Sequence, residues 1–402
     1  MDVKGKSHPC DSLDQLTAAI RDDRDGSVTL VWTPENDRMI LPEEVPGMGD
    51  ALRAARERWT RDDLENAQHR MRWFGTGCAA FGIYIFYRGF VFAGKLTTPS
   101  GSGIDFPNRL KFATHTVLAS TQSGVALLMF IIFAFIPWSQ ARKRRKELGS
   151  WNADGIAAAV PSMRLETWLE RQKAPVTKVL LALMGAVGLA QLLYHVKTSG
   201  WGSLTAIFHN WDGINEAGLE KDLYVQGQKW RLLTAPLLHG NVVHFLMNAS
   251  GLAYLGKRME VFARWPHLPM VFLFSASVGG VASAQFIKTP TVGASGGLMG
   301  WLGFLLVFET LHKELVPLRV RRRLLAGVFL TALIGLVGYR YIDNAAHAGG
   351  LLAGMVYAAI VFPKSSSAAR PGSTSTDRIA GGICLGVLIG AGVFAAYRII
   401  GG

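Results

Sequence analysis

Long apolar runs separated by short polar stretches make up most of the chain after residue 70. A helix needs about 20 mostly apolar residues to cross a bilayer. By this measure we expect nine spanning helices, at 72–94, 117–138, 177–196, 234–256, 268–288, 292–310, 324–340, 344–362 and 379–399. The run 234–256 is the least apolar of the nine. Polar groups at membrane depth usually face a bundle interior or a water-filled cavity, so this run is expected to line one.

The first 71 residues are polar and mixed in charge. Their pattern predicts short strands at 27–33 and 38–43, followed by a charged helix over 49–73 that leads into the membrane. We expect a small cytoplasmic module here, and no motif in it indicates a ligand.

The composition agrees with a polytopic membrane protein. Half of the residues are hydrophobic, and charged residues make up 18%, below the ~25% of an ordinary soluble protein. The net charge of +13 comes largely from clusters beside apolar runs, which orient a membrane protein, so nucleic acid is not expected as a partner. The three cysteines show no CxxC or Cys/His spacing, so we expect no disulfide framework, no metal site and no cofactor.

The basic clusters also predict the topology. Those at 142–146 and 317–323, together with Lys257, Arg258 and Arg264, fall on the cytoplasmic side if the N-terminus is cytoplasmic and the spans number nine. The first residues lack the apolar core of a signal peptide, and no organelle-targeting segment is evident. We therefore expect a multi-pass protein of a bacterial inner membrane, with its N-terminus in the cytoplasm and the loop 197–233 outside.

These expectations divide the chain into six parts. The first three are a cytoplasmic module (1–71), a two-helix transmembrane pair (72–138) and a basic cytoplasmic linker (139–176). The last three are a six-helix core (177–362), a flexible linker (363–378) and an additional transmembrane helix (379–402).

A serine and a histidine reach the same depth in this topology. Ser295 and His347 each lie a few residues from the outer end of their helix, roughly 5 Å into it. Serine becomes a nucleophile when a base removes its proton, and His347 is the candidate base. Both helices carry glycines four residues apart, a spacing that permits close helix contact in lipid: Gly296 and Gly300, Gly350 and Gly354.

A third helix carries paired hydrogen-bond donors. His244 and Asn248 are four residues apart and share one helix face. With the backbone N–H of Ser295, they could stabilise the oxyanion that forms in acyl transfer. His239 could hold the loop 197–233 by a hydrogen bond, or contact a substrate. Each feature taken alone also has a structural interpretation, because small residues and polar side chains commonly join membrane helices.

Three motifs in order closely resemble the rhomboid intramembrane serine proteases: "WRLLTAPLLHGNVVHFLMN" (230–248), "GASGG" (293–297) and "AHAGGLLAG" (346–354). The resemblance covers about 177–362, the family's six-helix core. It implies Ser295 as nucleophile and His347 as general base, without an acidic third member. It also implies an oxyanion site of His244, Asn248 and the Ser295 backbone. The substrates implied are membrane proteins whose spanning helix is unstable near its end.

The sequence departs from the family at two points. Met299 stands where rhomboids usually carry an aromatic residue packed against the base. Two helices and a polar module precede the core, and one helix follows it. The main competing interpretation is a rhomboid-like pseudoprotease that binds membrane proteins without cleaving them. A transporter is disfavoured, because no inverted repeat and no charged residue deep in the core spans is evident. The sequence specifies no oligomeric state.

Overall fold

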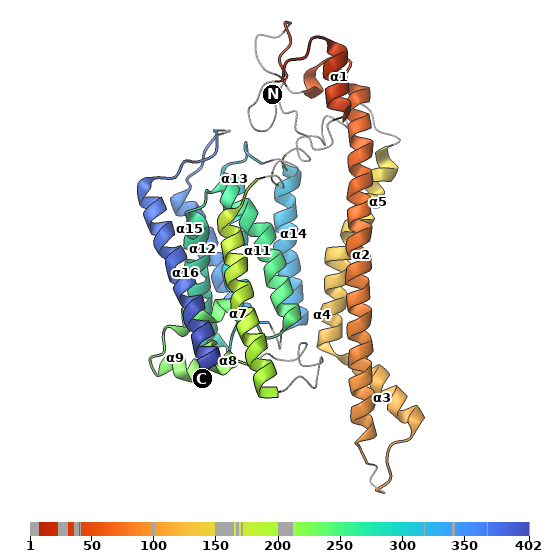
Figure 1. Ribbon diagram of the computed structural model, residues 1–402, viewed down its shortest axis with the longest axis vertical. Coiled ribbons are helices and arrows are strands. Elements are labelled where there is room, and N and C mark those ends of the chain that lie inside the picture. Colours follow the sequence, from red (N-terminus) through yellow and green to blue (C-terminus); the bar gives the residue numbers. More distant parts are fainter. Residues whose placement is uncertain are drawn as a thin grey trace. The chain divides into compact units, whose positions relative to one another are not determined.

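The protein is described here by a computed structural model (Figure 1). It describes residues 8–22, 31–35, 40, 42–97, 101–148, 165, 169, 172–199, 212–316, 318–339, 342–367 and 369–401. These residues are mostly helical and contain no strand beyond three isolated bridges. The prediction of an all-α, multi-pass membrane protein is confirmed.

Within the described residues, six helices are long and apolar enough to cross a membrane: 49–94, 126–147, 175–198, 267–286, 344–361 and 375–401. Two further expected spans coincide with shorter apolar helices, at 295–311 and 324–337. The remaining expected span, 234–256, overlaps a helix that carries several polar groups, α11 (Val242–Phe262).

The chain divides into two compact units, residues 1–168 with 332–340, and residues 169–331 with 341–402. The boundary at 168 falls inside the segment expected to be a basic linker.

The first unit begins with α1 (Leu13–Asp22), the short η1 (Pro42–Glu44) and α2 (Gly49–Gly94). Of the two expected strands, the described part is a single antiparallel bridge, in which Val31 and Ile40 exchange two backbone hydrogen bonds of 2.8 Å. The rest of 27–33 and 38–43 lies largely outside the described residues. The expected charged helix and the first span are one continuous helix, because α2 runs unbroken for 46 residues.

Three helices follow α2 in this unit: α3 (Phe106–Ala119), α4 (Thr121–Phe130) and α5 (Ile136–Glu147). The apolar run expected as one span from residue 117 is broken at Ser120, whose hydroxyl caps α4 by accepting from the N–H of Ser123 at 3.1 Å. A π-helical turn, η2 (Ile131–Phe135), joins α4 to α5. It ends two residues before Pro137, which lacks the N–H that a regular turn would use.

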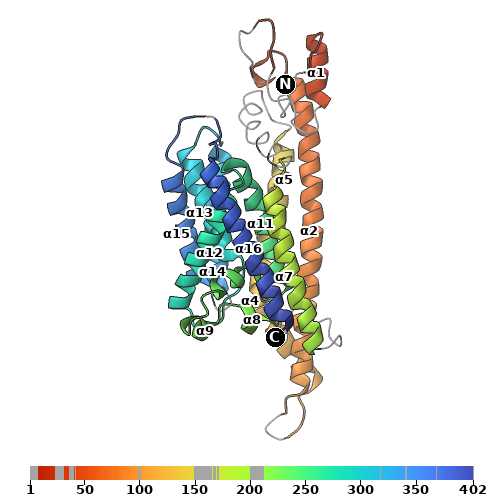
Figure 2. The ribbon, with the colours of Figure 1, turned by 60° about the vertical axis from the view of Figure 1, so that its left-hand side comes forward.

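The second unit is built around three closely packed helices: α12 (His267–Phe286), α13 (Ser295–Leu311) and α15 (Asn344–Val361). The most extensive helix contact of the described chain is that between α13 and α15. Around them lie α7 (Pro175–Ser199), α11 and α16 (Ser375–Gly401), with α16 alongside α7 in both views (Figures 1 and 2). The long α14 (Leu318–Val337) contributes its first part, through residue 331, to this unit.

The described part of the connection between α7 and α11, from residue 212, contains four short elements: α8 (Ile214–Ala217), α9 (Lys221–Val225), α10 (Arg231–Thr234) and η5 (Ala235–Leu237). The expected helix 234–256 was therefore wrong at its start. Pro236 lies in the 3₁₀ turn, and Asn241 caps α11 by accepting from the N–H of His244 at 2.9 Å. Since an Asn cap adopts extended backbone, the helix begins at residue 242 and not eight residues earlier.

The last helix covers α7 and this connection. An apolar cluster joins them through Val187, Ala217, Leu237, Leu238, Ala391, Ala395 and Ile399. The ring of Trp230 meets that of Phe394 edge to face, with centroids 5.0 Å apart. At the other end of α7, the Glu260 carboxylate accepts from the N–H groups of Val176 and Thr177 at 3.1 and 3.0 Å. These contacts fix α7 against α11 and α16.

Candidate active site

Backbone touches backbone where α13 meets α15. A Cβ added to Gly350 would overlap the carbonyl oxygen of Gly296, and one added to Gly354 would overlap that of Gly300. Any side chain at Gly350 or Gly354 would push the helices apart. The four glycines thus form a side-chain-free contact, as helices in lipid use for close approach.

This glycine contact flanks the serine and the histidine. Ser295 is the first residue of α13, directly before Gly296. His347 is the fourth residue of α15 and lies between Ala346 and Gly350, both of which face Gly296. Ser295 is therefore at the very start of its helix, whereas the sequence predicted it a few residues inside. The backbones that carry the two side chains meet at the same level of the helix pair.

A left-handed glycine directs the chain into Ser295. Gly293 has φ +118°, a conformation that other residues rarely adopt, and its N–H donates to the Ala235 carbonyl at 3.0 Å. A Cβ at Gly293 would come within 2.6 Å of the His244 ring and 3.2 Å of the Asn248 amide nitrogen. Glycine is required here twice, for its backbone conformation and for the space that α11 needs.

Residues 287–294 join α12 to α13 and are called the connector below. His244 and Asn248 of α11 point to it. The N–H of Gly240 donates to His244 Nδ1 at 3.4 Å, so the proton of the neutral ring is on Nε2, the atom facing Gly293. The Asn248 amide nitrogen is buried and has no hydrogen-bond partner among the described residues. Two N–H donors therefore converge beside the residue that lies two positions before Ser295.

His239 lies behind His244. It is fully buried, and its ring meets the ring of His244 edge to face at a centroid distance of 5.2 Å. The side-chain amide of Gln191 on α7 clamps its backbone, accepting from the His239 N–H at 2.9 Å and donating to the carbonyl at 3.0 Å. Gln191 could not be identified from a local pattern, because its partner is 48 residues away.

The described hydrogen bonds include none between the Ser295 hydroxyl and the His347 ring. Such bonds are often long in an enzyme without substrate and tighten when it binds. Met299, at the position where the family pattern has an aromatic residue, is 8% exposed and thus part of the packed interior.

Charged side chains of α11 and α13 pair at a distance from Ser295. Arg258 Nε donates to Glu309 Oε1 at 2.6 Å, and both side chains are almost fully buried near the far ends of their helices. The described residues contain no cluster of His, Cys, Asp and Glu that could hold a metal ion.

A second polar cluster was missed at the sequence level. Asp343 precedes α15, and its side chain meets Ser283 of α12 and Thr291 of the connector, which in turn bind Lys221 of α9. An Asp before an apolar helical run is a recognisable N-cap, so Asp343 could have been identified as the start of the helix. Its three partners could not, because they are at least 52 residues away in sequence.

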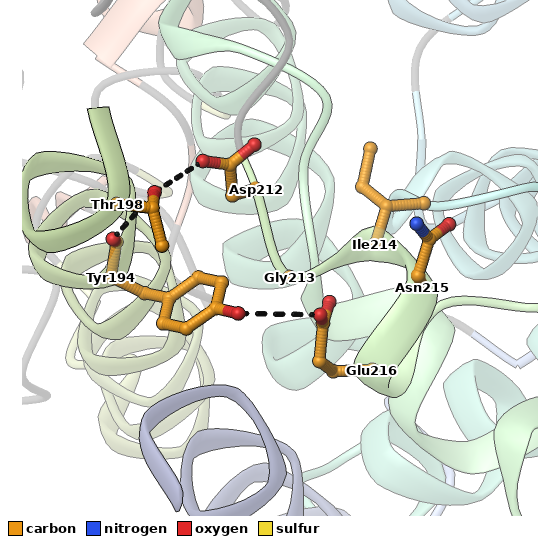
Figure 3. Close-up of a pocket in the computed structure, with 7 residues that line it drawn as sticks. All are labelled: Tyr194, Thr198, Asp212, Gly213, Ile214, Asn215 and Glu216. Carbon is orange, nitrogen blue, oxygen red and sulfur yellow. Dashed lines mark hydrogen bonds between the residues drawn. The ribbon is translucent and has the colours of Figure 1, made fainter. Parts of the chain in front are cut away.

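A pocket between α7 and α8 has none of the predicted site residues in its wall (Figure 3). It is lined by Tyr194, Thr198, Asp212, Gly213, Ile214, Asn215 and Glu216. Within it Thr198 donates to Asp212 at 2.7 Å and the Tyr194 hydroxyl donates to Glu216 at 3.5 Å. These bonds tie α8 to the end of α7.

Residues 226–364 match the family model described as Rhomboid domain. RHOMBOID-like protein 6, mitochondrial, from Arabidopsis thaliana is 36% identical over 148 residues, which are 36% of this chain and 47% of that protein. Rhomboid protease GluP from Bacillus subtilis (strain 168) is 30% identical over 149 residues, 37% of this chain and 29% of that protein. Inactive rhomboid protein 2 from Homo sapiens is 30% identical over 175 residues, 43% of this chain and 20% of that protein.

The fold defines an all-helical, multi-pass integral membrane protein with polar side chains buried among its helices. Residues 226–364 are thus a Rhomboid domain, and the resemblance to the rhomboid family carried by the three motifs is confirmed at the level of this domain. The match begins at residue 226, so α7 lies outside it. The chain spans less than half the length of these relatives, which include both a named protease and a named inactive protein.

Proposed function

We propose that this protein is an intramembrane serine endopeptidase that hydrolyses peptide bonds in or near the spanning helices of membrane proteins. Ser295 is the nucleophile and His347 the general base. The observation that carries the proposal is the contact of Gly296 with Ala346 and Gly350, which holds the serine and histidine backbones at one level without intervening side chains. A base must come within hydrogen-bond reach of the nucleophile, and so close a helix contact favours that approach.

The oxyanion that forms in acyl transfer needs N–H donors that are already in place. His244 supplies the Nε2 proton, because its Nδ1 accepts from Gly240. Asn248 supplies an amide without a described partner, and the N–H of Ser295 at the start of α13 supplies the third donor. His239 packs on the ring of His244 and supports it from behind.

The second candidate function is that of a pseudoprotease, which binds membrane-protein clients and does not cleave them. The similarity to Inactive rhomboid protein 2 favours it. Against it, this chain retains a serine, a histidine and two N–H donors in an arrangement that catalysis requires and client binding does not.

The site lies toward the end of the helix pair at which α13 and α15 begin. We propose that this end faces the outside of a bacterial inner membrane, with the N-terminus in the cytoplasm, because the basic clusters gather at the other ends of the spans. The substrates are spanning helices that unwind readily near that end. Gly or Pro near the cut lowers the cost of unwinding.

Labelling with a fluorophosphonate probe tests the proposal without knowledge of the substrate. The wild-type chain in detergent should react covalently at one serine. Ser295→Ala should abolish the reaction, and His347→Ala should slow it by a comparable factor because the two act as a unit. A wild-type chain that does not react, or a Ser295→Ala chain that still does, would contradict the assignment and favour the pseudoprotease.

A further inference from the structure

Four polar side chains from four segments meet beside the start of α15. They are Lys221 of α9, Ser283 of α12, Thr291 of the connector before Ser295, and Asp343. We refer to these four residues as the Asp343 cluster. Lys221 is 7% exposed and Ser283 is fully buried, while Thr291 and Asp343 are partly exposed. The proposed nucleophile, base and oxyanion donors do not include any of its members.

The donors in the cluster have a defined direction. The Lys221 ammonium, which can only donate, bonds Ser283 Oγ at 2.8 Å, Thr291 Oγ1 at 2.7 Å and the Leu219 carbonyl at 3.3 Å. Both hydroxyls then donate to the same carboxylate oxygen, Asp343 Oδ2. A buried cation is thus connected to a partly buried anion through two hydroxyl groups.

The other atoms of Asp343 hold the helix of the proposed base. Its Oδ1 accepts from the N–H of Ala346 at 2.8 Å, which caps α15, and its backbone carbonyl accepts from the N–H of His347 at 3.1 Å. The anion also lies at the positive end of the helix dipole. The orientation of the first turn of α15, which carries His347, therefore depends on where Asp343 is held.

The same cluster holds the segment that leads into Ser295. Thr291 lies four residues before the serine and pairs with Leu219 through two backbone hydrogen bonds of 3.0 and 3.1 Å. One network thus fixes the approach to the serine helix and the start of the histidine helix. We propose, building on the function proposed above, that Asp343 is a positioning residue for His347, held in place by Lys221 through Ser283 and Thr291.

This role gives the reaction a dependence on alkaline pH. Burial lowers the pKa of Lys221 to about 8, while the negative charges of Asp343 and of Glu220, the residue before Lys221, oppose this shift. Ser283 and Thr291, the remaining polar partners, are uncharged. When Lys221 loses its proton, the neutral amine can accept as well as donate a hydrogen bond, so Ser283 and Thr291 are no longer obliged to direct their hydroxyl protons at Asp343. The orientation of Asp343 is then less strictly defined. Reactivity of Ser295 should fall as the pH rises through about 8.

The test measures the rate of fluorophosphonate labelling of the full chain in detergent from about pH 6 to about pH 10, together with the melting temperature. The wild type should show a decline centred near pH 8, a result that needs no mutation. Lys221→Arg should move the decline to higher pH, because arginine keeps its proton. Lys221→Met should label about tenfold more slowly at neutral pH and show no decline near pH 8.

Asp343→Asn removes the negative charge and keeps the helix cap, because Asn is an equally good N-cap residue. It should retain the cap of α15 and still slow labelling about tenfold. The double variant Lys221→Met with Asp343→Asn should label faster than the two single effects combined predict, since neither charge is then left alone. The matched control is Lys229→Met, an exposed lysine of the same connection, which should behave as the wild type.

If the wild type shows no decline near pH 8, or if Asp343→Asn labels at the wild-type rate, the positioning role is wrong. Provided that the wild type is labelled and Ser295→Ala is not, that result leaves the proposed protease function standing. A wild-type chain that never reacts at Ser295 would overturn both.

Discussion

Gly350 and Gly296 share an asymmetric contact. A Cβ on Gly350 would overlap the carbonyl oxygen of Gly296, whereas a Cβ on Gly296 would meet the Ala346 carbonyl oxygen at 3.6 Å, an ordinary van der Waals distance. The two glycines belong to equivalent GxxxG patterns, yet only one of them is sterically obligatory.

Gly350→Ala should therefore destabilise the protein by about 1–3 kcal/mol or more and suppress labelling of Ser295, since the helices must separate. Gly296→Ala should keep or raise the melting temperature, because Ala favours a helix over Gly by ~1 kcal/mol. Thermal unfolding in detergent compares the two. Equal losses of melting temperature in the two variants would show that the difference between the two glycine contacts does not affect stability. Gly390→Ala on α16, where a Cβ meets nothing within 4 Å, is the control.

Asn248→Ala should separate activity from stability. The Asn248 amide nitrogen is buried without a described partner, so removing it relieves a desolvated donor and costs no hydrogen bond at that atom. We expect a melting temperature at or above that of the wild type, together with a labelling rate lower by about 10²–10³ for a lost oxyanion donor. A stability loss with unchanged labelling would make Asn248 a structural residue only.

Arg258 and Glu309 form a buried ion pair. The stability of the protein should fall more when one partner is removed than when both are replaced by apolar residues. Glu309→Ala leaves the Arg258 charge buried and alone, which should cost about 3–5 kcal/mol. The double variant Arg258→Met with Glu309→Leu should unfold at a higher temperature than Glu309→Ala. If it is the less stable of the two, the pair itself contributes net stability.

Lys221 should also affect stability with a definite sign. Its folded-state pKa, about 8, is below the unfolded value of 10.5, so between these values the unfolded chain binds more protons. The penalty for burying the charged lysine is complete below about pH 8 and is relieved as the pH rises toward the unfolded pKa. The melting temperature of Lys221→Met relative to the wild type should therefore fall across that window. A difference that stays constant with pH would mean that Lys221 is not buried as a cation.

Much of the helical framework followed from apolar periodicity. The expected spans 177–196, 268–288, 292–310, 344–362 and 379–399 each coincide with a helix to within a few residues at most ends. The errors occur where a polar side chain or proline ends the helix, as at Ser120 and Asn241, because hydropathy averages over such local hydrogen bonds.

The site was accessible from sequence only in part. Ser295, His347, His244 and Asn248 stand in short motifs whose spacing indicates helix faces, so they could be nominated as a group. The tautomer of His244, the clamp of Gln191 and the Asp343 cluster depend on contacts between distant segments. No local pattern encodes that Lys221 and Asp343, 122 positions apart, share the hydroxyl groups of Ser283 and Thr291.

The glycine contact between α13 and α15 leaves the vertical register of the two helices only half specified. Glycines spaced by four recur after about one turn, 5.4 Å along the axis. A slip of one turn would place Gly350 against Gly300 and keep one of the two close contacts, but it would carry His347 a full turn away from Ser295. The contact itself has no rotamers that could oppose such sliding. Groups at the ends of the helices add to the registration, and the carboxylate of Asp343, bonded to both the connector and α12, is placed to oppose such sliding.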